Sequence, residues 1–122
     1  MSLVLVVEDS PLQREMIATL LRNVGLQVVM ASDGVEAIAV FEKVKPALVV
    51  VDVVMPNMNG YELCRQLKNS DDTKHIPIVM CSTKAEEFDR YWGMRQGADA
   101  YISKPFQPEE MVGIVKELLQ KK

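Results

Sequence analysis

Four short apolar runs of the chain are each followed directly by side chains that can bind metal ions or phosphate. These side chains are Glu8 and Asp9 after the first run, Asp52 after the third, Ser82 after the fourth and Lys104 after the fifth. If the runs are parallel strands, their carboxyl ends share one edge of a sheet, and the side chains meet there. Three carboxylates, a hydroxyl and an ammonium group would then form one site.

This set of groups suits phosphoryl chemistry supported by a metal ion. Clustered carboxylates repel one another unless a cation accompanies them. Mg²⁺ prefers oxygen ligands and keeps several waters, whereas zinc would need Cys or His ligands. A carboxylate beside Mg²⁺ can attack phosphorus and become an aspartyl phosphate. The ammonium of Lys104 would offset the charge of the phosphoryl group, and Ser82 would donate a hydrogen bond to it.

Asp52 is the carboxylate that is hardest to explain without a function. It follows the apolar residues 47–51 and precedes Val53-Val54-Met55, where an unpaired charge would be costly. Taken singly, Glu8 and Asp9 could form an exposed turn, Ser82 could cap a helix and Lys104 could lie on the surface.

The elements that must position these residues are five apolar runs separated by segments long enough for helices. The runs are residues 3–7, 26–31, 47–51, 76–81 and 99–103. Several are apolar at successive positions, as in strands that are covered on both faces. Alternation with five helices predicts an α/β domain with a doubly wound parallel sheet.

Local signals mark the ends of several helices. The predicted N-caps are Ser10, Asn59 and Thr83, the last two because Glu follows at the third position; Gly25 and Gly97 are predicted to end the first and fourth helices; and the last helix is expected to open at Pro108. Each choice follows the known preferences of helix termini.

Composition narrows the class of protein. The chain has 122 residues, of which 48% are hydrophobic and 25% charged, with a net charge of −3. These values favour one globular domain over a disordered chain. Without a basic patch, direct binding to nucleic acid is not expected. We also expect no membrane segment or signal peptide, because the apolar runs are too short. Two cysteines make no disulfide framework, so a cytoplasmic location is expected.

The order and spacing of five segments resemble the receiver domains of two-component response regulators, especially stand-alone chemotaxis regulators of the CheY type. The segments are residues 6–10 (VVEDS), 31–37 (ASDGVEA), 51–60 (VDVVMPNMNG), 97–101 (GADAY) and 104–106 (KPF). The resemblance covers essentially the whole chain. It implies a single receiver domain over residues 1–122, with the flavodoxin-like strand order 2-1-3-4-5 and five helices.

The resemblance also implies roles for the acidic residues. Asp52 would accept a phosphoryl group from a phosphohistidine. Mg²⁺ would be held directly by Asp9 and Asp52, through a water by Glu8, and by the backbone carbonyl of Val54, whose side chain need not be polar.

Further roles follow from the same resemblance. Lys104 would contact the phosphoryl group, and its bond to Pro105 is commonly cis in the family. Ser82 and Tyr101 would be the hydroxyl and aromatic switch residues, with Tyr101 turning inward on activation. Phosphorylation would then bias a two-state equilibrium.

The implied partners are a sensor histidine kinase of the CheA kind or a phosphotransfer protein, and a downstream protein target. The target would bind the face formed by the fourth helix, the fifth strand and the fifth helix. We expect the protein to be a monomer, and we do not expect it to be an enzyme with a separate substrate. Residues 88–97 also resemble regulators of type IV pilus motility and phototaxis. Of Phe88, Tyr91 and Trp92, at least one should be exposed, because one helical stripe cannot hide all three.

Three alternatives remain open from the sequence. A receiver-fold scaffold could ignore phosphate altogether. An FMN-binding flavodoxin-like module is less favoured, because residues 8–12 are acidic and lack glycine, so an anion would be repelled there. A magnesium-dependent phosphatase with an aspartyl-phosphate intermediate would need a second Asp two residues after Asp52 and an insertion to cover its substrate.

Overall fold

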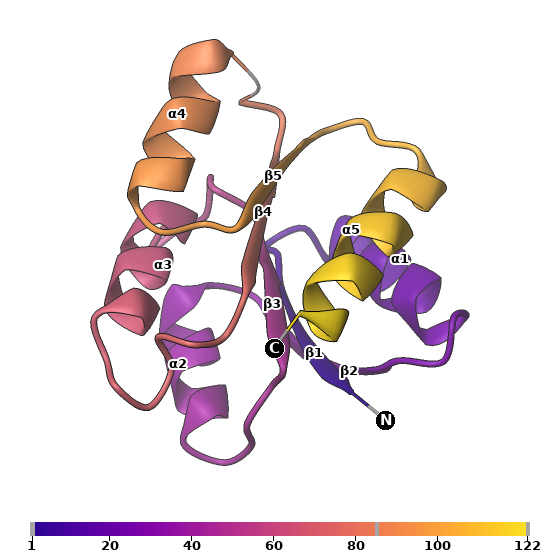
Figure 1. The fold of residues 1–122 in the computed structure, drawn as a ribbon, viewed down its shortest axis with the longest axis horizontal. Coiled ribbons are helices and arrows are strands. Elements are labelled where there is room, and N and C mark those ends of the chain that lie inside the picture. Colours follow the sequence, from indigo (N-terminus) through magenta and orange to yellow (C-terminus); the bar gives the residue numbers. More distant parts are fainter. Residues whose placement is uncertain (1, 85, 122) are drawn as a thin grey trace.

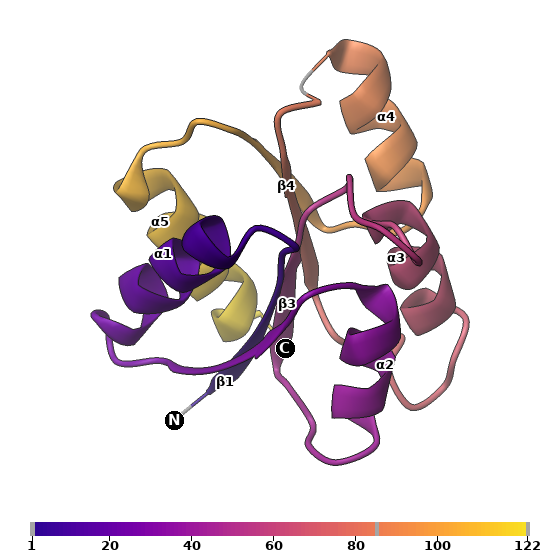
Figure 2. The same ribbon diagram turned by 180° about the vertical axis from the view of Figure 1, so that it is seen from behind.

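A five-stranded parallel sheet lies between two layers of helices (Figure 1). The computed structural model describes residues 2–84 and 86–121. The strands are β1 (Leu3–Val7), β2 (Gln27–Ala31), β3 (Leu48–Val51), β4 (Ile78–Ser82) and β5 (Ala100–Ser103), and the helices are α1 (Pro11–Arg22), α2 (Gly34–Phe41), α3 (Gly60–Lys68), α4 (Glu87–Arg95) and α5 (Pro108–Gln120). Helices α1 and α5 cover one face of the sheet, and α2, α3 and α4 cover the other, as the view from behind also shows (Figure 2).

The predicted fold class and strand order are confirmed. The sheet has the order β2-β1-β3-β4-β5, and the paired strands in it are parallel. The first predicted strand has the observed bounds. The second, third and fifth begin one residue later than predicted, and the fourth begins two residues later and ends one residue later.

The central strands are apolar at successive positions because both of their faces are covered. In β1, Val4 and Val6 pack with the α1 and α5 side chains, while Leu5 and Val7 pack with the side chains of the opposite layer. All four residues of β3 are buried. Polar groups are therefore excluded from the middle of the sheet and are left for the ends of the strands.

Most of the predicted helix ends are confirmed. Ser10 caps α1 by accepting a hydrogen bond from the Gln13 amide, and Asn59 caps α3 in the same way. Gly25 and Gly97 have φ angles of +91° and +110°, which glycine adopts without the strain that a Cβ would cause. Helix α5 opens at Pro108.

The prediction that Thr83 caps the fourth helix is wrong. Helix α4 begins at Glu87, and its capping box joins Glu86 with Asp89. Upstream of it, the Lys84 amide donates to the Ser82 hydroxyl at 3.1 Å. This contact holds Thr83 and Lys84 in the loop after β4, so the helix starts one turn later than the local pattern indicates.

Within the described residues, none of the helices has the length and apolar character that a membrane span requires.

Cys64 and Cys81 are both free thiols in the core. Burial raises the pKa of the Cys64 thiol to about 11 and that of Cys81 to about 12, which makes both groups poor nucleophiles.

Gly60, the first residue of α3, lies against the end of β3. A Cβ at this position would come within 2.4 Å of the Asp52 carbonyl oxygen and 2.9 Å of the Val53 Cα. Both neighbours are backbone atoms of the segment that carries Asp52, so they cannot turn aside as a flexible side chain could. The close approach therefore requires glycine.

We expect Gly60→Ala to lower the free energy of unfolding by about 1–3 kcal/mol, because overpacking must displace backbone. Gly113→Ala is the matched control. Gly113 also lies in a helix, but nothing would come within 4 Å of its Cβ, so alanine should stabilise the protein by roughly 0.5–1 kcal/mol. Urea unfolding measures both changes, and equal effects at the two positions would contradict the close approach.

Candidate functional site

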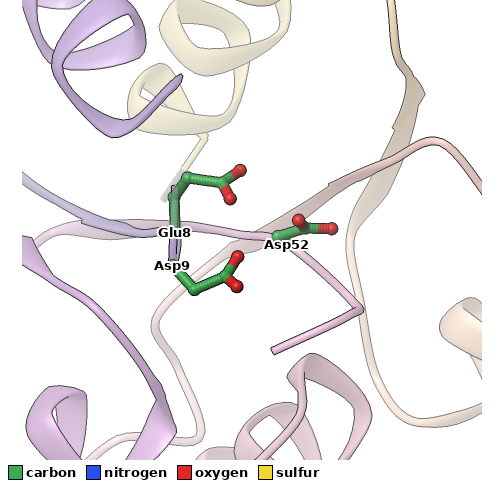
Figure 3. Close-up of side chains that lie close together, drawn as sticks. All are labelled: Glu8, Asp9 and Asp52. Carbon is green, nitrogen blue, oxygen red and sulfur yellow. The ribbon is translucent and has the colours of Figure 1, made fainter. Parts of the chain in front are cut away.

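Three carboxylates meet at one end of the sheet, as the sequence predicts. Each of Glu8, Asp9 and Asp52 offers an oxygen atom within 4.8 Å of the others. Figure 3 shows the three side chains gathered where β1 and β3 end. Glu8 is buried, Asp52 is partly exposed and Asp9 is exposed, so the cluster opens to solvent on the side of Asp9.

The register of the sheet brings these residues together. Val7 of β1 pairs with Val51 of β3, so the two strands end at the same level. The amide of Asp52 then donates to the carbonyl of Val7 at 3.1 Å, and the amide of Glu8 donates to the carbonyl of Ala31 at 3.0 Å. Parallel pairing thus continues one residue beyond the strands and holds the backbone under the acidic side chains.

Lys104 follows the edge strand β5 and contacts the cluster from there. Ser82 pairs with Ser103, and the Lys104 amide donates to the Ser82 carbonyl at 2.9 Å. The next peptide bond, to Pro105, is cis, as the family resemblance implied. The site therefore draws on the ends of β1, β3, β4 and β5.

The ammonium group of Lys104 donates three hydrogen bonds. Its Nζ lies 2.5 Å from Glu8 Oε1, 2.5 Å from Gln13 Oε1 and 3.3 Å from Asp52 Oδ2. An ammonium has three protons, so all three are used.

Burial dominates the electrostatics of Glu8. Only 2% of the residue is exposed, and this desolvation raises the pKa of its carboxyl group despite the hydrogen bond from Lys104; the nearby charge of Asp52 raises the pKa further. For Lys104, burial lowers the pKa, but the hydrogen bond to Glu8 and the charge of Asp52 outweigh it, so the pKa lies above its ordinary value. The lysine is therefore charged at neutral pH.

The acidic cluster fits a hard divalent cation. Three carboxylates face one ammonium group, which leaves an excess of negative charge at an edge that is open to water. Mg²⁺ prefers carboxylate oxygens in an arrangement that keeps several waters. Val54, the fourth predicted ligand, has an exposed side chain, and its amide donates to Asp52 Oδ1 at 3.3 Å; the role of its carbonyl stays a prediction.

Ser82 and Tyr101, the two predicted switch residues, contact the same neighbour. Ser82 is buried, and its hydroxyl accepts a hydrogen bond from the Lys84 amide. Tyr101 is buried on the side of α4, and its hydroxyl donates to the Lys84 carbonyl. The pKa of Tyr101 is raised, first by burial and then by Tyr61. The aromatic ring therefore points inward in this structure.

Arg90 and Gly93 of α4 hold the ring of Tyr101. The Arg90 guanidinium lies 5.6 Å from the centre of the ring and donates to the Tyr101 carbonyl at 3.2 Å. A Cβ on Gly93 would lie 2.9 Å from the ring and 2.8 Å from Met80 Sδ. The Tyr101 ring can occupy this space because Gly93 has no side chain.

Sequence reasoning missed three of these residues. Gln13, three residues after the predicted cap Ser10, contacts Lys104; a long polar side chain in the first helical turn after Glu8 and Asp9 is a signal that could have found it. Arg90 and Gly93 could not be found in this way, because their contacts join α4 to β5.

The expected exposure of the α4 aromatic residues is confirmed. Exposed fractions are 71% for Phe88, 58% for Tyr91 and 42% for Trp92. Such a group of large apolar side chains in one short helix is typical of an interaction surface.

Comparison with known proteins agrees with this geometry. Residues 4–116 match the family described as the response regulator receiver domain. Protein PilH of Pseudomonas aeruginosa is 36% identical over 119 residues, which cover 98% of both chains. The probable transcriptional regulator ycf27 of Pyropia yezoensis is 40% identical over 97% of this chain and 47% of its own, so the chain spans about half the length of such relatives. The solved structure of the chemotaxis response regulator CheY4 of Vibrio cholerae has a TM-score of 0.90 and 32% identity, covering 97% of this chain and 98% of that one.

Repulsion within the acidic cluster leads to a prediction about stability. Without divalent cations, Asp9→Asn should raise the free energy of unfolding by up to about 1 kcal/mol, because it removes one of three like charges near an exposed edge. With Mg²⁺ added, wild type should gain more stability than the variant, because bound metal stabilises the folded state by mass action.

Urea unfolding with and without Mg²⁺ measures both effects. Asp72→Asn, at an exposed carboxylate outside the cluster, is the control and should leave the gain from Mg²⁺ unchanged. An equal gain in wild type and Asp9→Asn would exclude Asp9 as a ligand.

Proposed function

The chain belongs to the response regulator receiver domain family, and we propose that Asp52 is its phosphoacceptor and that phosphorylation of Asp52 switches a protein-binding face. The observation that carries this proposal is the position of Asp52. Its carboxylate belongs to the acidic cluster, lies 3.3 Å from the ammonium of Lys104 and is partly open to solvent. Glu8 also contacts Lys104, but it is buried, so Asp52 is the carboxylate beside the fixed cation that a phosphoryl donor can reach from solution.

In the proposed reaction, an Asp52 carboxylate oxygen attacks the phosphorus of a phosphohistidine. The new P–O bond forms as the P–N bond breaks, and the bonding electrons return to the imidazole nitrogen of the donor. Lys104 offsets the charge on the phosphoryl oxygens, and the Ser82 hydroxyl donates a hydrogen bond to one of them. Mg²⁺, held by Glu8, Asp9, Asp52 and the Val54 carbonyl, would neutralise charge on the same oxygens.

The contacts of Lys84 support a route from the phosphoryl group to Tyr101. Its amide is bonded to Ser82 and its carbonyl to Tyr101. A Ser82 hydroxyl drawn to a phosphoryl group no longer holds the Lys84 amide in the same place, so the carbonyl that holds Tyr101 shifts as well. Phosphorylation then changes the populations of two arrangements of α4 and β5.

The proposed partners are a sensor histidine kinase, of the CheA kind, or a phosphotransfer protein as donor, and a protein target that binds the α4–β5–α5 face. The exposed aromatic residues of α4 supply apolar area for the target. Similarity to the proteins named PilH, PilG and CheY4 supports a pathway of the motility or chemotaxis type. We further propose that the protein acts in the cytoplasm as a monomer, signals through protein contacts rather than nucleic acid, and is not an enzyme with a separate substrate.

Beryllofluoride, a phosphoryl mimic, tests the proposed function. With Mg²⁺ present, it should shift the amide NMR signals around Asp52, Ser82 and Tyr101 in wild type, and it should leave those of Asp52→Asn unmoved, because the amide lacks the carboxylate oxygen that coordinates beryllium. Binding of Mg²⁺ with no response to beryllofluoride would instead identify a scaffold that ignores phosphate.

A second variant tests the route to α4. Gly93→Ala should force the Tyr101 ring out of the space beside α4, because the two would lie 2.9 Å apart. The variant should keep the beryllofluoride shifts near Asp52 but lose most of those at Tyr101 and in α4. Gly113→Ala, the open helical glycine, is the control and should behave as wild type. Full shifts in α4 of Gly93→Ala would reject this route.

A further inference from the structure

Gln13 occupies one of the three hydrogen bonds that Lys104 can donate. Its Oε1 lies 2.5 Å from the ammonium nitrogen, closer than the Asp52 oxygen at 3.3 Å. Gln13 lies in the first turn of α1 and Lys104 follows β5, so the contact joins segments 91 residues apart. A neutral amide thus shares the lysine with the phosphoacceptor.

A phosphoryl group on Asp52 would compete for this lysine. The group brings strong acceptor oxygens, yet the three protons of Lys104 already bond to Glu8, Gln13 and Asp52. Giving up the Glu8 bond would leave a buried carboxylate without its cation, which is costly. Giving up the Gln13 bond frees a neutral group that is only partly buried, so this bond costs less to release than the bond to Glu8.

The surroundings of Gln13 leave room for that release. The side chain lines a hollow of about 680 Å³ between α1 and the segment that leads to α5, together with Met16, Pro105 and Phe106. Its backbone is held in place, because the Gln13 amide donates to the Ser10 hydroxyl at 3.3 Å. The side-chain amide can therefore turn into the hollow and meet water without any movement of α1.

We propose that Gln13 is a positioning residue, which holds Lys104 in the unphosphorylated state and gives it up when Asp52 carries a phosphoryl group. The Gln13 bond stabilises the state before transfer and is absent after it. It therefore lowers the affinity of the site for the phosphoryl group and sets how readily Asp52 is modified. This inference rests on the proposed function of Asp52.

The experiment is a beryllofluoride titration of the full chain at saturating Mg²⁺, followed by NMR. Gln13→Met keeps the length of the side chain but cannot accept the hydrogen bond, and it should bind beryllofluoride about three- to tenfold more tightly, the range expected for loss of one competing hydrogen bond. Gln13→Glu should bind it more weakly than wild type, because a carboxylate holds the ammonium more strongly and repels the anion.

Two controls separate positioning from a structural role. Gln66→Met makes the same change at an exposed position in α3 and should leave the affinity unchanged. For Gln13→Met, the affinity for Mg²⁺ alone should stay within twofold of wild type, because the bond between Lys104 and Glu8 remains. The urea midpoint should fall only as far as the loss of one hydrogen bond requires. If this variant folds poorly, Gln13→Glu decides the question, since equal or tighter binding by that variant would overturn the proposal.

The experiment distinguishes failure of the role of Gln13 from failure of the proposed function. Unchanged or weaker beryllofluoride binding by a folded Gln13→Met, with normal binding by wild type, would overturn the role of Gln13 and leave the proposed function intact. Absence of beryllofluoride binding by wild type would overturn the proposed function and the role of Gln13 with it.

Discussion

The pairing of Lys104 with Glu8 is the interaction on which the site depends. A glutamate that is 2% exposed is tolerated only beside a cation, because an isolated charge away from water costs several kcal/mol. The lysine that supplies the cation lies 96 residues later in the chain. The pair therefore ties the first strand to the last one, and it places an ammonium group next to Asp52 in the unphosphorylated protein.

The sheet explains why the chemistry gathers at its edge. Helices cover both faces, so the middle of each central strand holds only apolar side chains, as in β3. Polar groups can then appear only where strands end, and parallel pairing of Val7 with Val51 brings two of those ends to one level. The same constraint that stabilises the core thus concentrates three carboxylates, whose repulsion makes the site responsive to a cation.

The sequence allows prediction of features that depend on burial and of helix ends that depend on local capping. Runs of apolar residues predicted the sheet, and the charged residues after them predicted the acidic cluster with Lys104. Thr83 was misread as a cap, because the contact between Lys84 and Ser82 overrides the local pattern. Gln13 and Gly93 were missed as contact residues, since each acquires its partner from another element. Prediction from sequence fails where a side chain, or the lack of one, acts across the fold.

Helix α4 has fewer buried residues than the other helices. Among its nine residues only Gly93 is buried, and glycine contributes no side chain to the core, while α1 is anchored by Ile17, Ala18 and Leu21. An element with few buried contacts opens at a lower free energy than the rest of a protein. Amide hydrogens of α4 should therefore exchange with solvent faster than those of α1. The segment that we propose as part of the partner-binding face is thus also the one that can be rearranged at the lowest cost in free energy.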